Sequence, residues 1–310
     1  INVLSDGNII TGTANARHQL NSYGDFTNYG NVSFTNRTLP VQSSYYSSEA
    51  TNGIVDFNAL NTSANQEIKC KNTTIFYRIE IDKGIDKTYE LVIEADDAAY
   101  FNLLGAASDS HPNNSQLNDN DNALGLIRGT VRIKTNVEIP YLNRGGNYNI
   151  FEAARIWVDG GTVTKQSGTG EAIVPYGEAR ITSGVFNSYC PSGFTLRENG
   201  LLKIEGGVVN AYQIRTSVYG AQHVGGYVQS GGYVNILSGS SSSQYYRFCM
   251  TYEGNVFSMT GGTLHIFDAN GNTGSTGGIF INSSPENINV SGGTVIAEVN
   301  NTTNPFKITS

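Results

Sequence analysis

The chain contains 310 residues, carries a net charge of −7, and only 15% of its residues are charged. A nucleic-acid-binding protein needs a basic surface, and this sequence never places more than two Lys or Arg residues together, which excludes that class. No window offers the ~20 consecutive apolar residues of a transmembrane helix. The chain begins at Ile1 without a basic and apolar signal peptide, so we expect a mature product or a fragment.

Residues 1–122 predict strands of irregular spacing separated by long loops. The stretches 24-GDFTNYGNVSFTN-36, 66-QEIKCKNTTIFYRIEIDKG-84 and 88-TYELVIEA-95 alternate apolar and polar residues, which indicates strands with one buried face. Between them, 40-PVQSSYYSSEATNG-53 and 106-AASDSHPNNSQLNDNDN-122 are rich in turn residues and lack periodicity. We expect both to be surface loops.

Residues 123–310 repeat one short unit, an apolar and polar alternation interrupted by one or two glycines. Seven copies align on Gly129, Gly161, Gly184, Gly207, Gly232, Gly262 and Gly293, as in 156-IWVDGGTV-163, 202-LKIEGGVV-209 and 288-INVSGGTV-295. Glycine reaches backbone angles that a Cβ forbids. We therefore predict that each of these glycines forms a corner between two short strands.

This pattern predicts an all-β fold, a single domain over residues 1–310 that forms a right-handed parallel β-helix like that of pectate lyases. About 12 coils would stack at a strand spacing of ~4.8 Å. Antiparallel hairpins are the alternative, but they would place Asn-Gly or Asp-Gly turns every ~10 residues. The inward apolar positions are predicted to include Ile156, Ile204, Val209, Val290 and Val295. Cys70, Cys190 and Cys249 have neither disulfide nor zinc spacing, and we expect buried free thiols.

The ISGGTV-like units and the stretch 75-IFYRIEIDKGIDKTYELVI-93 resemble the parallel β-helix segments of Bacteroidota surface proteins exported by the type IX secretion system. The resemblance implies an extracellular or cell-surface protein of the adhesin or gliding-motility type. It also implies a surface polysaccharide or other cell-surface ligand as a partner, and the secretion machinery as a partner during export. The family's C-terminal secretion domain is not recognisable here, so export is implied only if that part was cleaved or omitted.

Other β-helices are polysaccharide lyases or glycoside hydrolases, and this enzymatic function is the alternative to a structural or adhesive one. The pair Asp96-Asp97 and the later 132-RIK-134 match two short motifs of the pectin-degrading hydrolases, but the N-T-D and G-H-G motifs are missing. We therefore assign no catalytic residue. The alternative is that Asp96-Asp97 ends one strand and that Arg132 and Lys134 lie on the solvent side of another.

Two surface sites remain as hypotheses. Asp119 and Asp121, within 118-NDNDN-122, offer oxygen ligands for Ca²⁺, although the pattern of a complete calcium loop is missing. The residues Tyr212, Tyr219, Tyr233, Tyr245, Tyr246 and Arg247 would form a glycan-binding platform if they shared one face. The alternative is that tyrosine simply suits half-exposed strand positions. Trp157 alternates with Ile156 and Val158, so it is predicted either to face outward or to pack as a single ring.

Overall fold

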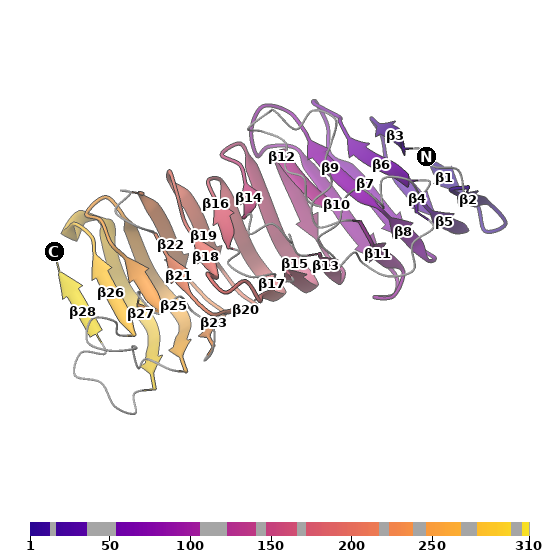
Figure 1. Ribbon diagram of the computed structural model, residues 1–310. Helices are drawn as coiled ribbons and strands as arrows, with labels where there is room; N and C mark the ends of the chain where they lie inside the picture. Colours follow the sequence, from indigo (N-terminus) through magenta and orange to yellow (C-terminus); the bar gives the residue numbers. More distant parts are fainter. Residues whose placement is uncertain are drawn as a thin grey trace.

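The computed structural model describes residues 1–12, 17–35, 54–105, 123–140, 147–165, 172–216, 223–237, 246–267, 278–298 and 306–309. These residues form 28 strands and one short 3-10 helix, Pro285–Asn287. Every strand pairing among them is parallel, within hydrogen-bonded sheets of 17, 7 and 4 strands. The strands stack side by side into an elongated body with the N-terminus at one end and the C-terminus at the other (Figure 1). The predicted all-β fold of parallel strands is confirmed, and the antiparallel alternative is wrong.

The strands occupy three columns, and the chain visits the first, second and third column in that order again and again. We call one visit to all three columns a pass. The first column contains β3 Arg17–Ser22, β6 Ile54–Ala59, β9 Arg78–Asp82, the start of β12 Leu124–Ile133, β14 Tyr148–Ile150, β16 Ile173–Pro175, β18 Phe194–Thr195, β21 Ile214–Arg215, β24 Phe248–Met250, β26 Ile279–Asn282 and β28 Phe306–Thr309. Its two sheets meet where the Tyr148 hydroxyl donates to the Leu124 carbonyl over 3.1 Å.

The second column contains β1 Asn2–Val3, β4 Phe26–Asn28, β7 Gln66–Cys70, β10 Glu90–Ala95, the end of β12, the starts of β15 Ala154–Lys165 and β17 Glu178–Ser188, β19 Gly200–Ile204, β22 Gly225–Gln229, and the starts of β25 Val256–Ile266 and β27 Ile288–Ala297. The third column contains β2 Asn8–Ile10, β5 Asn31–Ser33, β8 Thr74–Phe76, β11 Phe101–Leu103, β13 Val137–Ile139, β20 Val208–Ala211, β23 Tyr233–Ile236 and the ends of β15, β17, β25 and β27.

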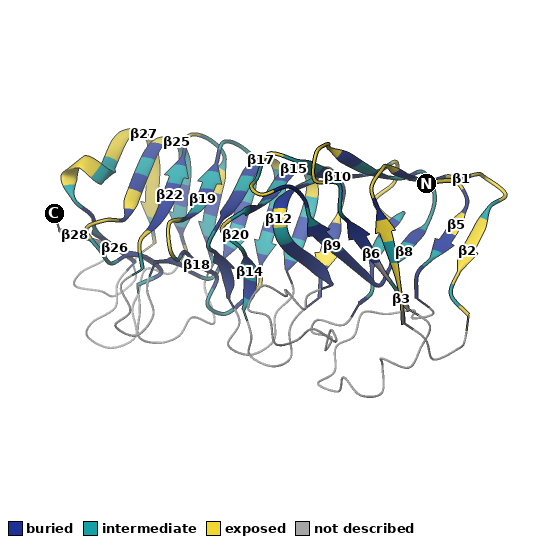
Figure 2. Cartoon of the chain, turned by 90° about the horizontal axis from the view of Figure 1, so that it is seen from above, coloured by how far each residue is buried: buried dark blue, intermediate teal, exposed yellow. Residues whose placement is uncertain are grey.

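A continuous apolar core runs through the space between the columns, from Val3 to Ile281. In the second and third columns, alternate side chains point into this core, as the burial pattern along the strands shows (Figure 2). The first column differs, because β16, β18, β21 and β24 are buried along their whole length. Along these four strands the first column presents no open outer surface, whereas β9, β14 and β26 of the same column keep the alternating pattern.

The predicted inward positions divide into two groups. Ile156, Ile204 and Val209 are completely buried. Val290 and Val295 continue the same inward rows, since they pair with Met259 and Leu264, yet they are 61% and 41% exposed. Their prediction as core residues is wrong because no further strand of the described residues covers β27 in either column.

The corner glycines confirm the explanation of the repeat. Gly161, Gly184, Gly207, Gly232, Gly262 and Gly293 have φ between 64° and 90° and join the second column to the third. A Cβ on Gly207 would lie 2.6 Å from the carbonyl oxygen of Gly184 in the preceding pass. The passes approach each other so closely here that both the backbone angle and the space require glycine.

Gly129 does not belong to this row, so its alignment with the other six glycines is wrong. Its φ is also positive, but it pairs with Ala154 at the boundary between the first and second columns. The preceding-pass neighbour of Gly161 is Thr135, whose carbonyl oxygen would lie 2.3 Å from a Cβ on that glycine. Two different corners thus share one local sequence pattern, because both need a left-handed backbone.

Replacing Gly207 with Ala should lower the free energy of unfolding by about 3 kcal/mol, through the unfavourable φ and the contact with Gly184. Gly24→Ala is the matched control, because nothing lies within 4 Å of its added Cβ. That variant should stay within about 1 kcal/mol of the wild type in urea unfolding. Equal costs for the two variants would contradict the role of the corners.

Candidate functional site

The outer surface of the second column carries a cation–aromatic stack. Arg132 on β12, Trp157 on β15 and Arg180 on β17 are register partners in three successive passes. The guanidinium carbons of Arg132 and Arg180 lie 4.0 Å and 4.4 Å from the centroid of the Trp157 ring. Trp157 lies on the outer surface of the column, and the guanidinium groups of Arg132 and Arg180 pack over its ring, so the packed-ring alternative is the one that the structure supports. The ring offers no open face to a sugar.

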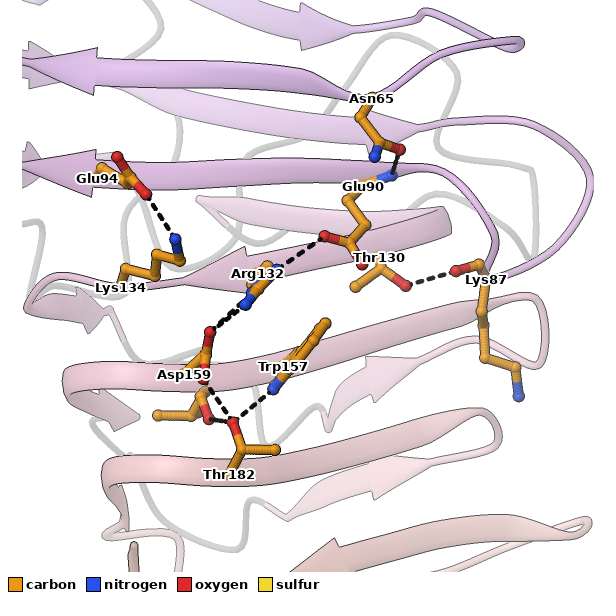
Figure 3. A network of polar contacts seen from close by, with 11 residues as sticks. Asn65, Lys87, Glu90, Glu94, Thr130, Arg132, Lys134, Trp157, Asp159 and Thr182 are labelled. Atoms are coloured by element: carbon orange, nitrogen blue, oxygen red, sulfur yellow. Dashed lines mark hydrogen bonds and ion pairs between the residues drawn. The ribbon is translucent and has the colours of Figure 1, made fainter. Parts of the chain in front are cut away.

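Carboxylates and a hydroxyl hold this stack in place (Figure 3). Arg132 Nε donates to Asp159 Oδ2 over 2.8 Å. The Thr182 hydroxyl donates to Asp159 Oδ1 over 2.7 Å, and it accepts a hydrogen bond from Trp157 Nε1 over 2.8 Å. Two more carboxylates pair with the arginines: Arg132 Nη1 lies 3.6 Å from Glu90 Oε2, and Arg180 pairs with Glu205. We use the name Trp157 network for Trp157 together with these partners: Glu90, Arg132, Asp159, Arg180, Thr182 and Glu205.

The Trp157 network stabilises the ionised form of Asp159. Partial burial opposes ionisation of this carboxyl group. The hydrogen bonds from Thr182 and Arg132, together with the positive charges of Arg132 and Lys134, outweigh burial and hold the pKa of Asp159 below its ordinary value. Asp159 is therefore a charged acceptor at neutral pH, which suits an ion pair better than a proton donor.

Further ion pairs connect the second column along its length. Lys134 Nζ lies 2.8 Å from Glu94, and Arg155 lies 2.8 Å from Glu178 in the next pass. A single surface ion pair contributes only ~0–1 kcal/mol to the free energy of unfolding. As a set, however, these pairs favour one register between neighbouring passes. Opposite charges face each other only when neighbouring passes are correctly aligned.

The residues that matched hydrolase motifs are part of these contacts. Asp96 follows the last residue of β10 and pairs with Lys71, while Asp97 Oδ1 accepts the Ala99 amide over 2.8 Å. Arg132 and Lys134 are partly exposed and paired with carboxylates. The strand-end interpretation of Asp96-Asp97 and the solvent-side interpretation of Arg132 and Lys134 are confirmed.

A buried lysine lies beneath the corner between the first and second columns. Lys83 is fully buried, and its Nζ donates to Gln66 Oε1 over 2.7 Å and to the Asn61 carbonyl over 3.0 Å. Burial lowers the pKa of Lys83 to about 8. An amine with this pKa would suit a general base. The side chain has no exposed surface through which a substrate would reach it.

The outer surface of the third column carries a ladder of asparagine side chains. Asn210 Nδ2 donates to Asn187 Oδ1 over 2.7 Å, and Asn235 Nδ2 donates to Asn210 Oδ1 over 2.8 Å. At its first end, Asn187 Nδ2 donates to Thr164 Oγ1 over 3.3 Å. These four residues are register partners in successive passes. We call them the asparagine ladder.

Sequence reasoning missed the asparagine ladder, although a signal was present. Each asparagine stands three residues after a corner glycine, as Asn187 follows Gly184 and Asn210 follows Gly207. The same rule finds Asn235 after Gly232. A corner fixes the register of the strand that follows it, so residues at one offset must stack.

The predicted tyrosine platform does not gather on one face in the described residues. Tyr233 begins β23 in the third column and is 59% exposed. Tyr246 precedes β24 in the first column, and its ring packs 5.1 Å from that of Phe280. Tyr212 follows β20 and is half-buried, whereas Arg247 is only 9% exposed.

Several predicted residues lie outside the described part of the chain: Tyr219, Tyr245, Asp119 and Asp121. The glycan platform and the Ca²⁺ site thus stay predictions where they depend on these residues. Within the described ranges, no group of three His, Cys, Asp or Glu side chains is placed to hold a metal ion. No described helix has the length and apolar character to cross a membrane.

The three cysteines are buried free thiols, as predicted. Burial raises the pKa of Cys70 to about 11 and that of Cys249 to about 12. Both thiols therefore stay protonated at neutral pH and behave as small apolar side chains.

Comparisons of the chain with protein-family models, with curated proteins and with solved structures find no match.

Replacing Asp159 with Asn tests the Trp157 network. Because the pKa of Asp159 is lowered in the folded protein, its stabilising effect is present above the ordinary carboxyl pKa and is lost as the pH falls. The variant should be about 1 kcal/mol less stable than the wild type at pH 6, and this difference should shrink below about pH 4. Urea unfolding followed by the fluorescence of Trp157, the only tryptophan, measures it. A difference that is constant from pH 6 to pH 3 would contradict the role of the Asp159 charge.

Proposed function

We propose that the stacked passes form one right-handed parallel β-helix of about 12 coils. Two observations support this architecture. The chain visits the three columns in the same order, and successive passes pair in parallel. Parallel strands of one sheet are joined by right-handed crossovers in ~98% of cases, which favours the right hand.

We further propose that this β-helix is a structural or adhesive segment of an extracellular bacterial surface protein. The observation that carries the proposal is the contrast between the second and third columns. On the second column, the strongest candidates for acid–base chemistry are paired with opposite charges of neighbouring passes, which favours rigidity over catalysis. The third column presents neutral polar groups in a regular row, a surface suited to attachment.

The resemblance of the ISGGTV-like units to Bacteroidota surface proteins supports the same location and the type IX route of export. A rigid rod without disulfides would hold a binding surface away from the cell through backbone pairing and apolar packing alone. Under this proposal the partner is a surface polysaccharide or another cell-surface ligand. The function requires no cofactor.

Incubation of the protein with a panel of plant, algal and bacterial polysaccharides tests this function. Retention on an insoluble polysaccharide or on whole cells, without release of reducing ends or unsaturated sugars, is the expected result. Release of new chain ends would replace the adhesive function with that of a hydrolase or lyase. If the protein neither binds nor cleaves any of them, attachment to glycans is rejected. The Asp159→Asn variant serves as a control, because binding should persist without the Trp157 network.

A further inference from the structure

We propose that the outer surface of the third column, from β15 to β23, binds an extended neutral polysaccharide that lies along the long axis of the protein. This inference rests on the proposed attachment function and names its binding face and its class of ligand.

The asparagine ladder leaves hydrogen-bonding groups available in a regular row. An asparagine side chain has two N–H donors and an oxygen with two acceptor positions. Within the ladder, Asn210 uses one donor toward Asn187 and one acceptor position toward Asn235. One N–H and one lone pair of the Asn210 amide therefore remain for a ligand. Such a donor and acceptor pair matches the neighbouring hydroxyl groups of a sugar.

A second outward row runs beside the ladder, two residues earlier in each strand. Its members share half-exposed or exposed positions and are Thr162, Val185, Val208, Tyr233 and Thr263. Tyr233 is 59% exposed, so part of its ring is open. Sugar rings have apolar C–H faces, and a row of valine and tyrosine side chains beside amides provides both kinds of contact.

The charge of this surface selects the ligand class. Neither row contains Lys, Arg, Asp or Glu between Thr162 and His265. An anionic polysaccharide would gain no ion pair here, whereas a neutral one needs none. The neighbouring second column does not supply the missing positive charge for an anionic ligand, because Arg132 and Arg180 are already paired with Asp159 and Glu205.

The direction of the ligand follows from the stacking. Neighbouring passes repeat at the strand spacing of ~4.8 Å. One sugar of an extended, β-linked chain has nearly the same length, so successive sugars would meet successive rungs. The small mismatch is tolerable because the neutral stretch covers few passes.

Charged groups mark both ends of the neutral stretch. Glu138, exposed on β13, is the register partner of Thr164 at the first end. At the other end, His265 follows Asn235 in register, and its Nε2 lies 2.7 Å from Glu298 Oε1. The His265 ring also stacks on Phe267, with centroids 3.8 Å apart. The binding stretch thus runs from Thr164 to Asn235, about one sugar per rung.

Two variants of this face test the inference. Tyr233→Ala removes the exposed ring, and Asn235→Asp keeps the shape of the amide but replaces its donor with a charge. Lys203→Ala, on the outer surface of the second column, is the matched control. Binding to insoluble cellulose, chitin and mannan, and to soluble alginate and a sulfated galactan, is measured by depletion and by retarded migration in affinity gels. Circular dichroism and thermal melting confirm that each variant is folded.

The wild type should bind at least one of the neutral polysaccharides and neither anionic one. Tyr233→Ala and Asn235→Asp should each weaken that binding about tenfold, while Lys203→Ala leaves it unchanged. If Tyr233→Ala does not fold, Val208→Glu, one pass earlier in the same row, should cause the same loss.

Three outcomes would overturn the inference. If the wild type binds a neutral polysaccharide and the third-column variants bind equally well, the face is wrong while the attachment function stands. If only an anionic polysaccharide is bound, the ligand class is wrong and attachment again stands. Failure to bind any polysaccharide or cell surface would reject both the inference and the proposed function.

Discussion

Parallel backbone pairing between successive passes is the constraint on which the rest of the structure depends. Each pass satisfies its backbone N–H and C=O groups on the passes before and after it, so residues at one offset from a corner must stack in rows. The inward rows then become the apolar core, and the outward rows become columns of identical or complementary side chains. The corner glycines allow this pairing, because the passes approach too closely for a Cβ at Gly207.

The outer surfaces of the second and third columns use this stacking in different ways. On the second column, side chains of opposite charge alternate between passes, and Arg132, Trp157 and Arg180 form a closed stack. Their contacts are directed along the column, and they align one pass with the next. On the third column, Asn210 contacts Asn187 and Asn235, but its amide keeps one N–H donor and one acceptor position beyond these two bonds. One surface stabilises register, and the other is suited to a ligand.

The sequence alone was sufficient to predict the parallel strands and the corner glycines, because both depend on local patterns. The assignment of Gly129 to the common row failed since a left-handed backbone is needed at two different corners. The alternation along the strand correctly places Val290 and Val295 in the inward rows. It does not reveal whether another strand covers them, and both side chains are exposed. Tyr233 and Tyr246 lie in different columns, which could not be known before the corners were placed. The pairing of Arg132 with Trp157 likewise depended on a register that the misaligned Gly129 obscured.

The register of neighbouring passes can be measured directly by disulfide formation at the asparagine ladder. The three native cysteines are buried free thiols, so an introduced surface pair can be followed separately. Asn187→Cys combined with Asn210→Cys places two thiols on adjacent passes, ~4.8 Å apart, within the Cα separation that a disulfide spans. Asn187→Cys combined with Asn235→Cys leaves one pass between them, ~9.6 Å, which is beyond the ~7 Å limit. We expect rapid oxidation of the first pair under mild conditions and none of the second. Equal oxidation of both pairs, or of the second alone, would contradict the stacking on which the fold and the proposed binding face depend.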